Sequence, residues 1–200
     1  GRPPEDFEHG VSRFRGRVAA WVNVPEKDGR PTKDGTSLVR TAEAKVVAQL
    51  ASEILTEAPD LSLGIITFYA AQQARILEEL AEFGVTELSE DGISIAEPYR
   101  MLETNSGQRE ERFRVGTVDA FQGKEFDIVI LSMVRSGAVK TDATVRETFG
   151  FLTSANRTCV ALSRQRRLLV IVGDRGLVDL PNADRVRGLV ELAELCGEPL

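Results

Sequence analysis

Two short segments of this sequence combine residue types that suit phosphate and nucleotide chemistry. Residues 122–125 read Gln-Gly-Lys-Glu, and residues 163–167 read Ser-Arg-Gln-Arg-Arg. A glycine turn lets the backbone approach a ligand closely, and arginine side chains stabilise the charge on a transferring phosphoryl group. The pattern G-x-x-x-x-G-K-[ST] is absent, because Glu125 replaces its hydroxyl residue and no glycine lies five places before Gly123. The sequence therefore indicates no phosphate-binding loop of its own.

Strands that alternate with helices must position these segments. Apolar runs predict strands over residues 18–24, 63–68, 113–118, 128–134 and 168–172. Apolar residues at helical spacing predict helices over residues 41–58, 70–83, 154–166 and 184–195. The alternation predicts an α/β domain with a mostly parallel sheet and helices on both faces, in three layers.

In such sheets, ligands bind beyond the carboxyl ends of the strands. The first candidates for functional residues are therefore those that directly follow a strand. They are residues 67–69 with Gln72, residues 117–125 and Arg135, together with the cluster 163–167 before the last strand.

The remaining segments are interpreted as connections around one domain. Residues 1–17 form a polar, proline-containing lead, residues 18–200 form the domain, and residues 26–35 are expected to be an exposed loop. Residues 85–112 are polar and rich in turn-forming residues, so we expect a surface insertion or a short hairpin around Ile93 and Ile95.

Composition excludes several classes of protein. The chain has 200 residues, of which 42% are hydrophobic, and its apolar runs are only strand-sized, so we expect one buried core and no membrane segment. The first ten residues show no secretory pattern, and two cysteines favour a reducing, cytoplasmic location. A single histidine and the absence of a C-x-x-C pair predict no metal site.

The net charge of −6 conceals an uneven distribution along the chain. Residues 109–175 carry 12 Lys and Arg against 8 Asp and Glu, so the basic side chains concentrate where the two segments lie. A basic face is compatible with a nucleic-acid partner, and equally with a solvated surface.

Three segments resemble helicase motifs IV, V and VI of superfamily 1, in that order: LGIITFYAAQ (63–72), VGTVDAFQGKEFDIVILSMVRS (115–136) and GFLTSANRTCVALSRQRRLLVIVGD (150–174). The resemblance covers about residues 19–178 and is greatest to the 5′-to-3′ branch that includes the nonsense-mediated-decay helicase. It implies the second RecA-like domain of an ATP-dependent DNA or RNA helicase. ATP and Mg²⁺ would be held mainly by an N-terminal RecA-like domain, so this chain alone is expected to be inactive.

The resemblance also implies roles for residues of the ATP site. Arg164 matches the motif VI arginine that reaches the phosphates, and Arg166 matches the second arginine of that motif. Glu125 matches the motif V glutamate that binds the ribose, with Gly123 and Gln122 in the same cleft. The alternatives are a helix-end cation for Arg164, pairing with nearby carboxylates for Arg166, and a solvated turn carboxylate for Glu125.

Single-stranded DNA or RNA is the partner that the resemblance implies. Thr117 is the candidate for a phosphate contact, and Tyr69 and Gln72 are candidates for contact with the strand or the interdomain cleft. Thr117 is equally compatible with an ordinary strand residue, and Tyr69 with a packed one. A different class of function also stays open: a non-catalytic nucleic-acid-binding or interaction module that kept the fold.

The sequence departs from the motifs at three positions. Phe68 stands where the family has proline, Cys159 where it has asparagine, and Gln165 where it has alanine. None of these changes removes a charge that hydrolysis needs. Cys159 is expected to be buried on the apolar side of its helix rather than to act as a nucleophile.

Overall fold

A five-stranded parallel sheet forms the centre of the computed structural model, which describes residues 4–90, 92–103, 107–137 and 144–200. The order across the sheet is β1 (Ala19–Asn23), β11 (Gln165–Gly173), β10 (Phe126–Ser132), β4 (Leu63–Thr67) and β9 (Phe113–Thr117). Each strand is parallel to its neighbours, with Ile130 of β10 opposite Ile65 of β4 and Val170 of β11. The five strands correspond to the five apolar runs of the sequence.

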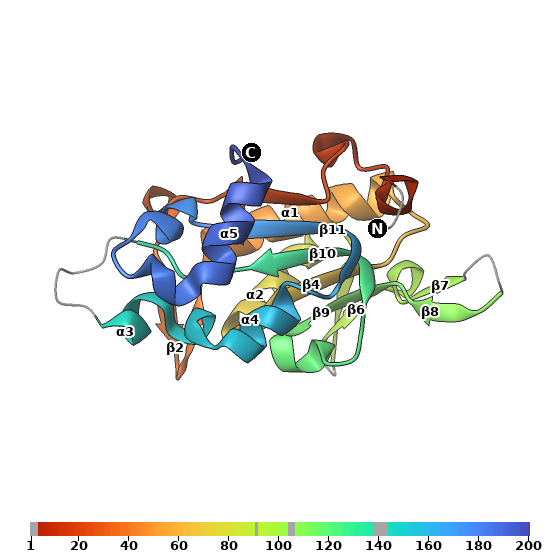
Figure 1. Cartoon of the computed structure of the whole chain (residues 1–200). Helices are drawn as coiled ribbons and strands as arrows, with labels where there is room; N and C mark the ends of the chain where they lie inside the picture. The colour runs from red at the N-terminus through yellow and green to blue at the C-terminus, as the bar shows by residue number, and fades with distance from the viewer. Residues whose placement is uncertain (1–3, 91, 104–106, 138–143) are drawn as a thin grey trace.

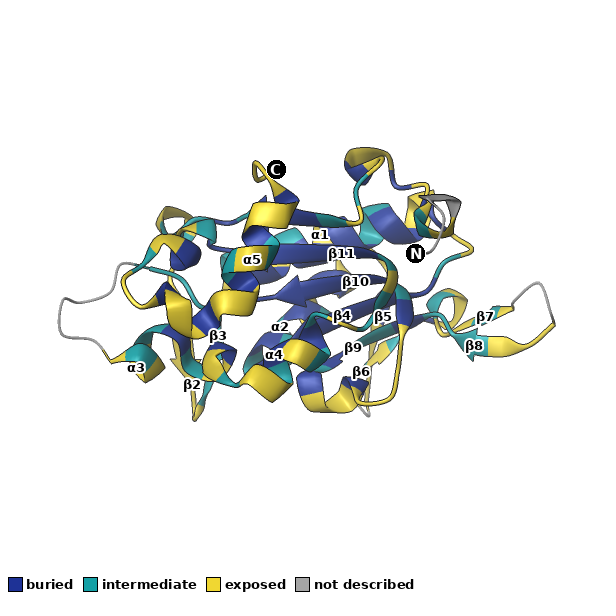
Figure 2. Cartoon of the chain, in the orientation of Figure 1, coloured by how far each residue is buried: buried dark blue, intermediate teal, exposed yellow. Residues whose placement is uncertain are grey.

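Helices cover both faces of this sheet (Figure 1). On one face, α1 (Thr41–Glu57) and α2 (Ala70–Ala81) pack against alternate strand residues such as Ile65 and Ile130. On the other face, α5 (Arg187–Cys196) packs with Leu131 and Ile171 in a second core, and α4 (Ala155–Ala161) and the short α3 (Val145–Phe149) lie on the same side. Figure 2 shows the central strands buried between these layers. The predicted three-layer α/β fold is confirmed.

Short elements complete the described chain. Three antiparallel hairpins pair β2 (Thr32–Asp34) with β3 (Ser37–Val39), β5 (Thr86–Ser89) with β6 (Gly92–Ile95), and β7 (Met101–Glu103) with β8 (Arg109–Glu111). The 3₁₀ helices are η1 (Pro4–Phe7), η2 (Ser12–Phe14), η3 (Glu26–Asp28), η4 (Glu97–Tyr99), η5 (Val118–Phe121), η6 (Gly150–Thr153), η7 (Arg175–Asp179) and η8 (Ala183–Val186). Among the described residues, no helix is long and apolar enough to cross a membrane.

Several boundaries differ from the predicted ones. The helix expected over residues 154–166 ends at Ala161, and Gln165 already pairs with Phe126 as the first residue of β11. The helix expected over 184–195 is divided into η8 and α5. The loop expected over 26–35 contains β2. The hairpin expected around Ile93 and Ile95 is present as β5 and β6, and the interval 85–112 also holds a second hairpin, β7 and β8. In the lead, Val11 and Phe14 pack into the core that α1 covers.

The connection from β9 to β10 crosses β4, because β4 lies between these two strands in the sheet. η5 lies in this connection, and its Phe121 is fully buried against the sheet. A methyl group at Gly64 of β4 would lie 2.7 Å from the Phe121 ring and 3.0 Å from the Phe126 ring. The absence of a side chain at Gly64 therefore makes room for the aromatic residue that anchors the connection.

We expect Gly64→Ala to destabilise the fold by about 1–3 kcal/mol, the usual cost of overpacking a core. The measurement is denaturant unfolding of the variant beside the parent chain. Gly188→Ala is the matched control, because Gly188 lies in α5 with no atom within 4 Å of the added carbon. The control should gain up to about 1 kcal/mol in helix propensity. Equal stability of the two variants would contradict the packing of Phe121 on Gly64.

Candidate functional site

The predicted site residues fall at two opposite ends of the strands. Residues 122–125 lie directly before β10, and Arg164 directly precedes β11, so this group gathers at the amino ends of the two strands. Thr117 is the last residue of β9, and Tyr69 lies two residues after β4, so this second group lies at the carboxyl ends. Residues 117–125 thus follow β9, and Arg164 lies before the last strand, as the sequence predicted, but residues 122–125 and Arg164 gather at the amino ends of β10 and β11.

At the amino ends, motif V and motif VI residues are in direct contact. The Phe126 amide donates to the Arg164 carbonyl at 2.9 Å, which joins the ends of the two segments. The Arg166 guanidinium lies 3.7 Å from the carboxylate of Glu125 and 3.7 Å from that of Glu110, and all three side chains are 41–57% exposed. Such exposed pairs are weak, so these groups stay accessible to a ligand.

The turn before Glu125 is open to solvent. Gly123 has φ +74°, a conformation that favours glycine, and no atom lies within 4 Å of a side-chain carbon placed there. The Lys124 amide donates to the Phe121 carbonyl at 3.1 Å, which closes the turn. Gln122 and Glu125 are both exposed on it. The backbone at Gly123 is therefore open to approach from solvent.

Arg164 lies at the end of α4, where its side chain is half-buried. Its Nε donates to the Val160 carbonyl at 3.2 Å, and its Nη2 donates to the Ser163 hydroxyl at 2.9 Å. These contacts are those of a cation at a helix carboxyl terminus. The side chain therefore rests on its own helix in this structure.

At the carboxyl ends, Thr117 and Tyr69 lie in different environments. Thr117 pairs with Thr67 across the sheet and is half-buried. Tyr69 is 4% exposed, and its hydroxyl accepts a hydrogen bond from Nε of Arg135 at 2.8 Å. Gln72 is completely buried, so the strand or cleft contact predicted for it finds no exposed atom in this structure.

Motifs V and VI are also linked on this side. Arg157 of α4 lies 3.2 Å from the carboxylate of Asp119, which belongs to η5. Cys159 of the same helix is exposed, so the prediction that it is buried is wrong. The reason is the short α4, whose buried face is formed by Thr158 and Ala161.

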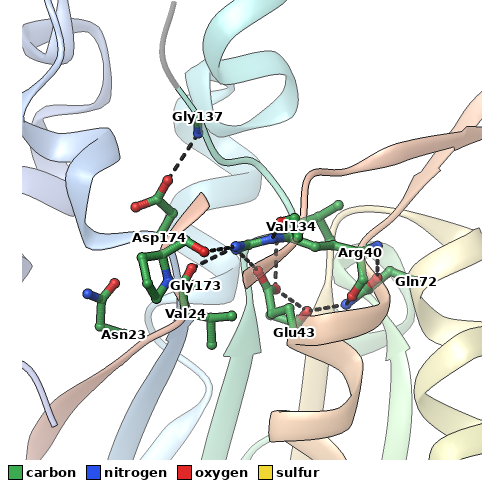
Figure 3. Close-up of polar contacts among 12 residues, drawn as sticks. Asn23, Val24, Arg40, Glu43, Gln72, Val134, Gly137, Gly173 and Asp174 are labelled. Atoms are coloured by element: carbon green, nitrogen blue, oxygen red, sulfur yellow. Dashed lines mark hydrogen bonds and ion pairs between the residues drawn. The ribbon is translucent and has the colours of Figure 1, made fainter. Parts of the chain in front are cut away.

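A buried polar network that the sequence analysis missed holds the carboxyl ends in place (Figure 3). Glu43 of α1 accepts hydrogen bonds from the Ser132 hydroxyl at 2.6 Å and the Val134 amide at 2.8 Å. Its other oxygen lies 3.2 Å from Nη1 of Arg40, and both side chains are completely buried. Glu43 falls on the apolar side of α1, one turn before Val47. A charged residue at an apolar position of the helix was the signal in the sequence for a buried polar contact.

The network ties three segments together. Arg40 donates to the carbonyls of Val24, Pro25 and Gly29, each at 2.8 Å, so it fixes the chain beyond β1. Gln72 accepts from the Arg40 amide at 2.7 Å and donates to the Ser132 hydroxyl at 3.0 Å. Gln72 therefore joins α2 to the exit of β10.

Val134 has φ +67°, a strained conformation for a β-branched residue. The Arg135 amide donates to the Met133 carbonyl at 2.8 Å, so the chain reverses tightly here. The hydrogen bond from Val134 to Glu43 holds this turn. The turn places Arg135, whose side chain then reaches Tyr69.

The described residues include no group of three or more His, Cys, Asp and Glu side chains that could hold a metal ion. The exposed carboxylate of Glu125 is suited to accept hydrogen bonds from ribose hydroxyls, and the two arginines are suited to phosphates. The residues present therefore fit part of a nucleotide site.

The parallel sheet between two layers of helices is the architecture of a RecA-like domain. A family described as an AAA domain matches residues 6–176, and the chain belongs to this family, within the superfamily-1 helicases. This confirms the resemblance that the motifs indicated.

Relatives agree with this assignment. The chain is 31% identical over 171 residues to the Helicase required for RNAi-mediated heterochromatin assembly 1 of Schizosaccharomyces pombe, with 84% of this chain and 14% of that protein covered. It is 33% identical over 145 residues to the Regulator of nonsense transcripts 1 of Dictyostelium discoideum, with 72% of this chain and 9% of that protein covered. The chain thus spans a small part of these curated relatives.

Among solved structures, the C-terminal domain of a possible DNA helicase from Lactobacillus plantarum is 17% identical with a TM-score of 0.46, covering 90% of this chain and 91% of that one.

We expect Glu43→Ala to cost about 3–5 kcal/mol of unfolding free energy at neutral pH, because it leaves the Arg40 charge buried without its partner. Denaturant unfolding measures this loss. Glu191→Ala is the control, since Glu191 pairs with Arg187 on the surface and its loss should cost about 1 kcal/mol or less. A loss at Glu43 no larger than at Glu191 would contradict the role of the network.

The parent chain and the Glu43→Ala variant also allow a test of pH dependence. Burial raises the pKa of Glu43, although the hydrogen bonds from Ser132 and Val134 and the charge of Arg40 act to lower it. The folded chain therefore holds this proton more tightly than the unfolded chain. The stability from this group is fully present below its ordinary pKa and is lost as the pH rises through the raised pKa of the folded state, so the difference in stability between the parent and Glu43→Ala should shrink over that interval.

Proposed function

We propose that this chain is the second motor domain of an ATP-dependent helicase, which completes an ATP site on a first RecA-like domain and grips single-stranded DNA or RNA. The observation that carries the proposal is the meeting of residues 122–125 and 164–166 at adjacent strand ends, about 40 residues apart in sequence. A solitary nucleotide-binding domain would need a phosphate-binding loop, which this sequence lacks.

The nucleotide side of the domain uses charges that a partner domain would complete. Glu125 binds the ribose hydroxyls, and the open turn at Gly123 and Gln122 accommodates the nucleotide. Arg164 leaves its contacts on α4 to reach the phosphates, and Arg166 exchanges its carboxylate partners for them. The Mg²⁺ ligands and the phosphate-binding lysine come from the first domain.

The nucleic-acid side lies at the carboxyl ends of the strands. Thr117 donates its hydroxyl to a strand phosphate, a contact that carries no base information. Tyr69 supports this edge through Arg135, and Gln72 supports it from inside through Ser132. Single-stranded nucleic acid therefore runs across the edge where the exits of β4 and β9 lie together.

A non-catalytic nucleic-acid-binding module is the second candidate. The contacts of Arg164 with Val160 and Ser163 favour it, because they satisfy the arginine without a nucleotide. The two candidates differ in the size of effect that Arg164 must have. An arginine that reaches the phosphates from a facing domain contributes about 10³- to 10⁵-fold in rate. A cation at a helix end contributes about 1 kcal/mol or less, and only to stability.

We expect Arg164→Ala in the full-length protein to lower nucleic-acid-stimulated ATP turnover by about 10³-fold or more while single-strand affinity survives. Arg164→Lys should rescue poorly, because a point charge lacks the planar fork that spans two phosphate oxygens. Steady-state turnover, melting temperature and single-strand affinity are measured together. Arg185→Ala, at an exposed arginine of η8, is the control. Turnover within about fivefold of the parent in both Arg164 variants would instead support the non-catalytic module.

A second test separates binding from chemistry at Glu125. Because a ribose contact is made equally in the ground and transition states, Glu125→Gln should raise the KM for ATP by about 10-fold and leave kcat nearly unchanged. Steady-state kinetics of the full-length protein measures both values. Glu87→Gln on the exposed β5 hairpin is the control. An unchanged KM would return Glu125 to the role of a solvated turn carboxylate.

A further inference from the structure

An aromatic ring lies exposed at the carboxyl edge, in a part of motif VI to which no role has been assigned above. Phe151 belongs to η6 and is 43% exposed, whereas its neighbour Leu152 is 2% exposed. Leu152 anchors the helical turn in the core, so the exposed position of Phe151 is fixed by the fold. A ligand that covered the exposed part of this ring would remove apolar surface from water, which is favourable.

The ring is supported from behind by a second aromatic residue. The centroid of Tyr69 lies 5.3 Å from that of Phe151, with the planes tilted by 49°. Tyr69 is itself held by the hydrogen bond from Arg135, whose guanidinium lies 5.7 Å from the Tyr69 centroid. Phe151 therefore rests on a rigid base that motif IV and the exit of β10 provide.

A planar cation extends the ring towards motif V. The guanidinium of Arg157 lies over the Phe151 ring, 4.9 Å from its centroid, and its Nη2 lies 3.2 Å from the carboxylate of Asp119. Asp119 lies two residues after Thr117, the candidate for a phosphate contact. The stack thus leads from the exposed ring to the predicted phosphate site along one edge of the sheet.

We propose that Phe151, extended by Arg157, is a stacking platform for a nucleobase of the bound single strand. This inference rests on the proposed function, since it adds a base contact to the phosphate contact at Thr117. Aromatic rings and guanidinium planes both stack on bases, and such stacking tolerates any sequence because every base has a π-face. The platform grips the base while Thr117 grips the backbone.

The experiment compares two fluorescent single strands of equal length and phosphate number, one of thymidines and one wholly abasic, in the full-length protein by anisotropy. Phe151→Ala should weaken thymidine-strand binding by about 5- to 150-fold and leave abasic-strand binding unchanged. Phe151→Trp should restore binding, because it keeps a π-face, whereas Phe151→Leu should not. The contribution of the bases to the binding free energy should also vary less with salt concentration than the contribution of the phosphates.

Controls separate this inference from the proposed function. Phe83→Ala removes a ring of 42% exposure beyond the end of α2, and it should change neither affinity. Thr117→Ala should weaken both strands alike. If both strands bind and Phe151→Ala weakens them equally or not at all, the stacking platform is overturned while the proposed function stands. If the parent binds neither strand, the proposed binding of single-stranded nucleic acid is wrong, and the stacking platform that rests on it is wrong as well.

Discussion

The geometry of the carboxyl edge depends on one buried ion pair. Glu43 and Arg40 both come from the start of α1, yet their contacts reach the exit of β10 and the chain beyond β1. A charge in the core is tolerated only when it is paired and hydrogen-bonded, so every backbone group around the pair is held in a fixed place. Val134 can therefore keep its strained conformation, and Arg135 is aimed at Tyr69. Tyr69 and Gln72, two of the residues predicted to meet nucleic acid, therefore take their positions from this network.

The connection between β9 and β10 links the two edges of the domain. It begins at Thr117, at the carboxyl end of one strand, and ends at Glu125, at the amino end of the other. Between them, Phe121 is fixed on Gly64, and Asp119 is paired with Arg157 of α4. Because the segment is short and held at its middle, a displacement at one end must be absorbed at the other or at Phe121. This gives a physical route by which the nucleotide side and the strand side of the proposed motor would influence each other.

Elements that consist of apolar runs or periodic apolar residues were predicted correctly from the sequence. Helix ends and buried contacts that depend on polar groups were not. The five strands of the sheet, α1 and α2 follow from their hydrophobic patterns. The end of α4 did not, because residues 163–167 have helical composition but lie beyond the end of α4, and β11 begins at Gln165, which pairs with Phe126 of β10. The start of α3 depends on the capping box of Thr144 and Glu147, a short polar signal outside any apolar run. The burial of Glu43 depends on partners 89 and 91 residues away, which no local pattern reveals.

The basic segment of the sequence is not simply a surface of free cations, because several of its described side chains already hold carboxylate partners. The pairs at the two edges are Arg166 with Glu125 and Glu110, Lys124 with Glu111, and Arg157 with Asp119. Their side chains are 31–58% exposed, so each pair contributes little to stability, about 0–1 kcal/mol. A phosphate offers an arginine a bidentate, charge-assisted partner of greater strength. Exchange of a carboxylate for a phosphate therefore costs the fold little, whereas the buried pair of Arg40 and Glu43 cannot be exchanged at all. The chain thus separates its charges into those that build the edge and those that remain available to a ligand.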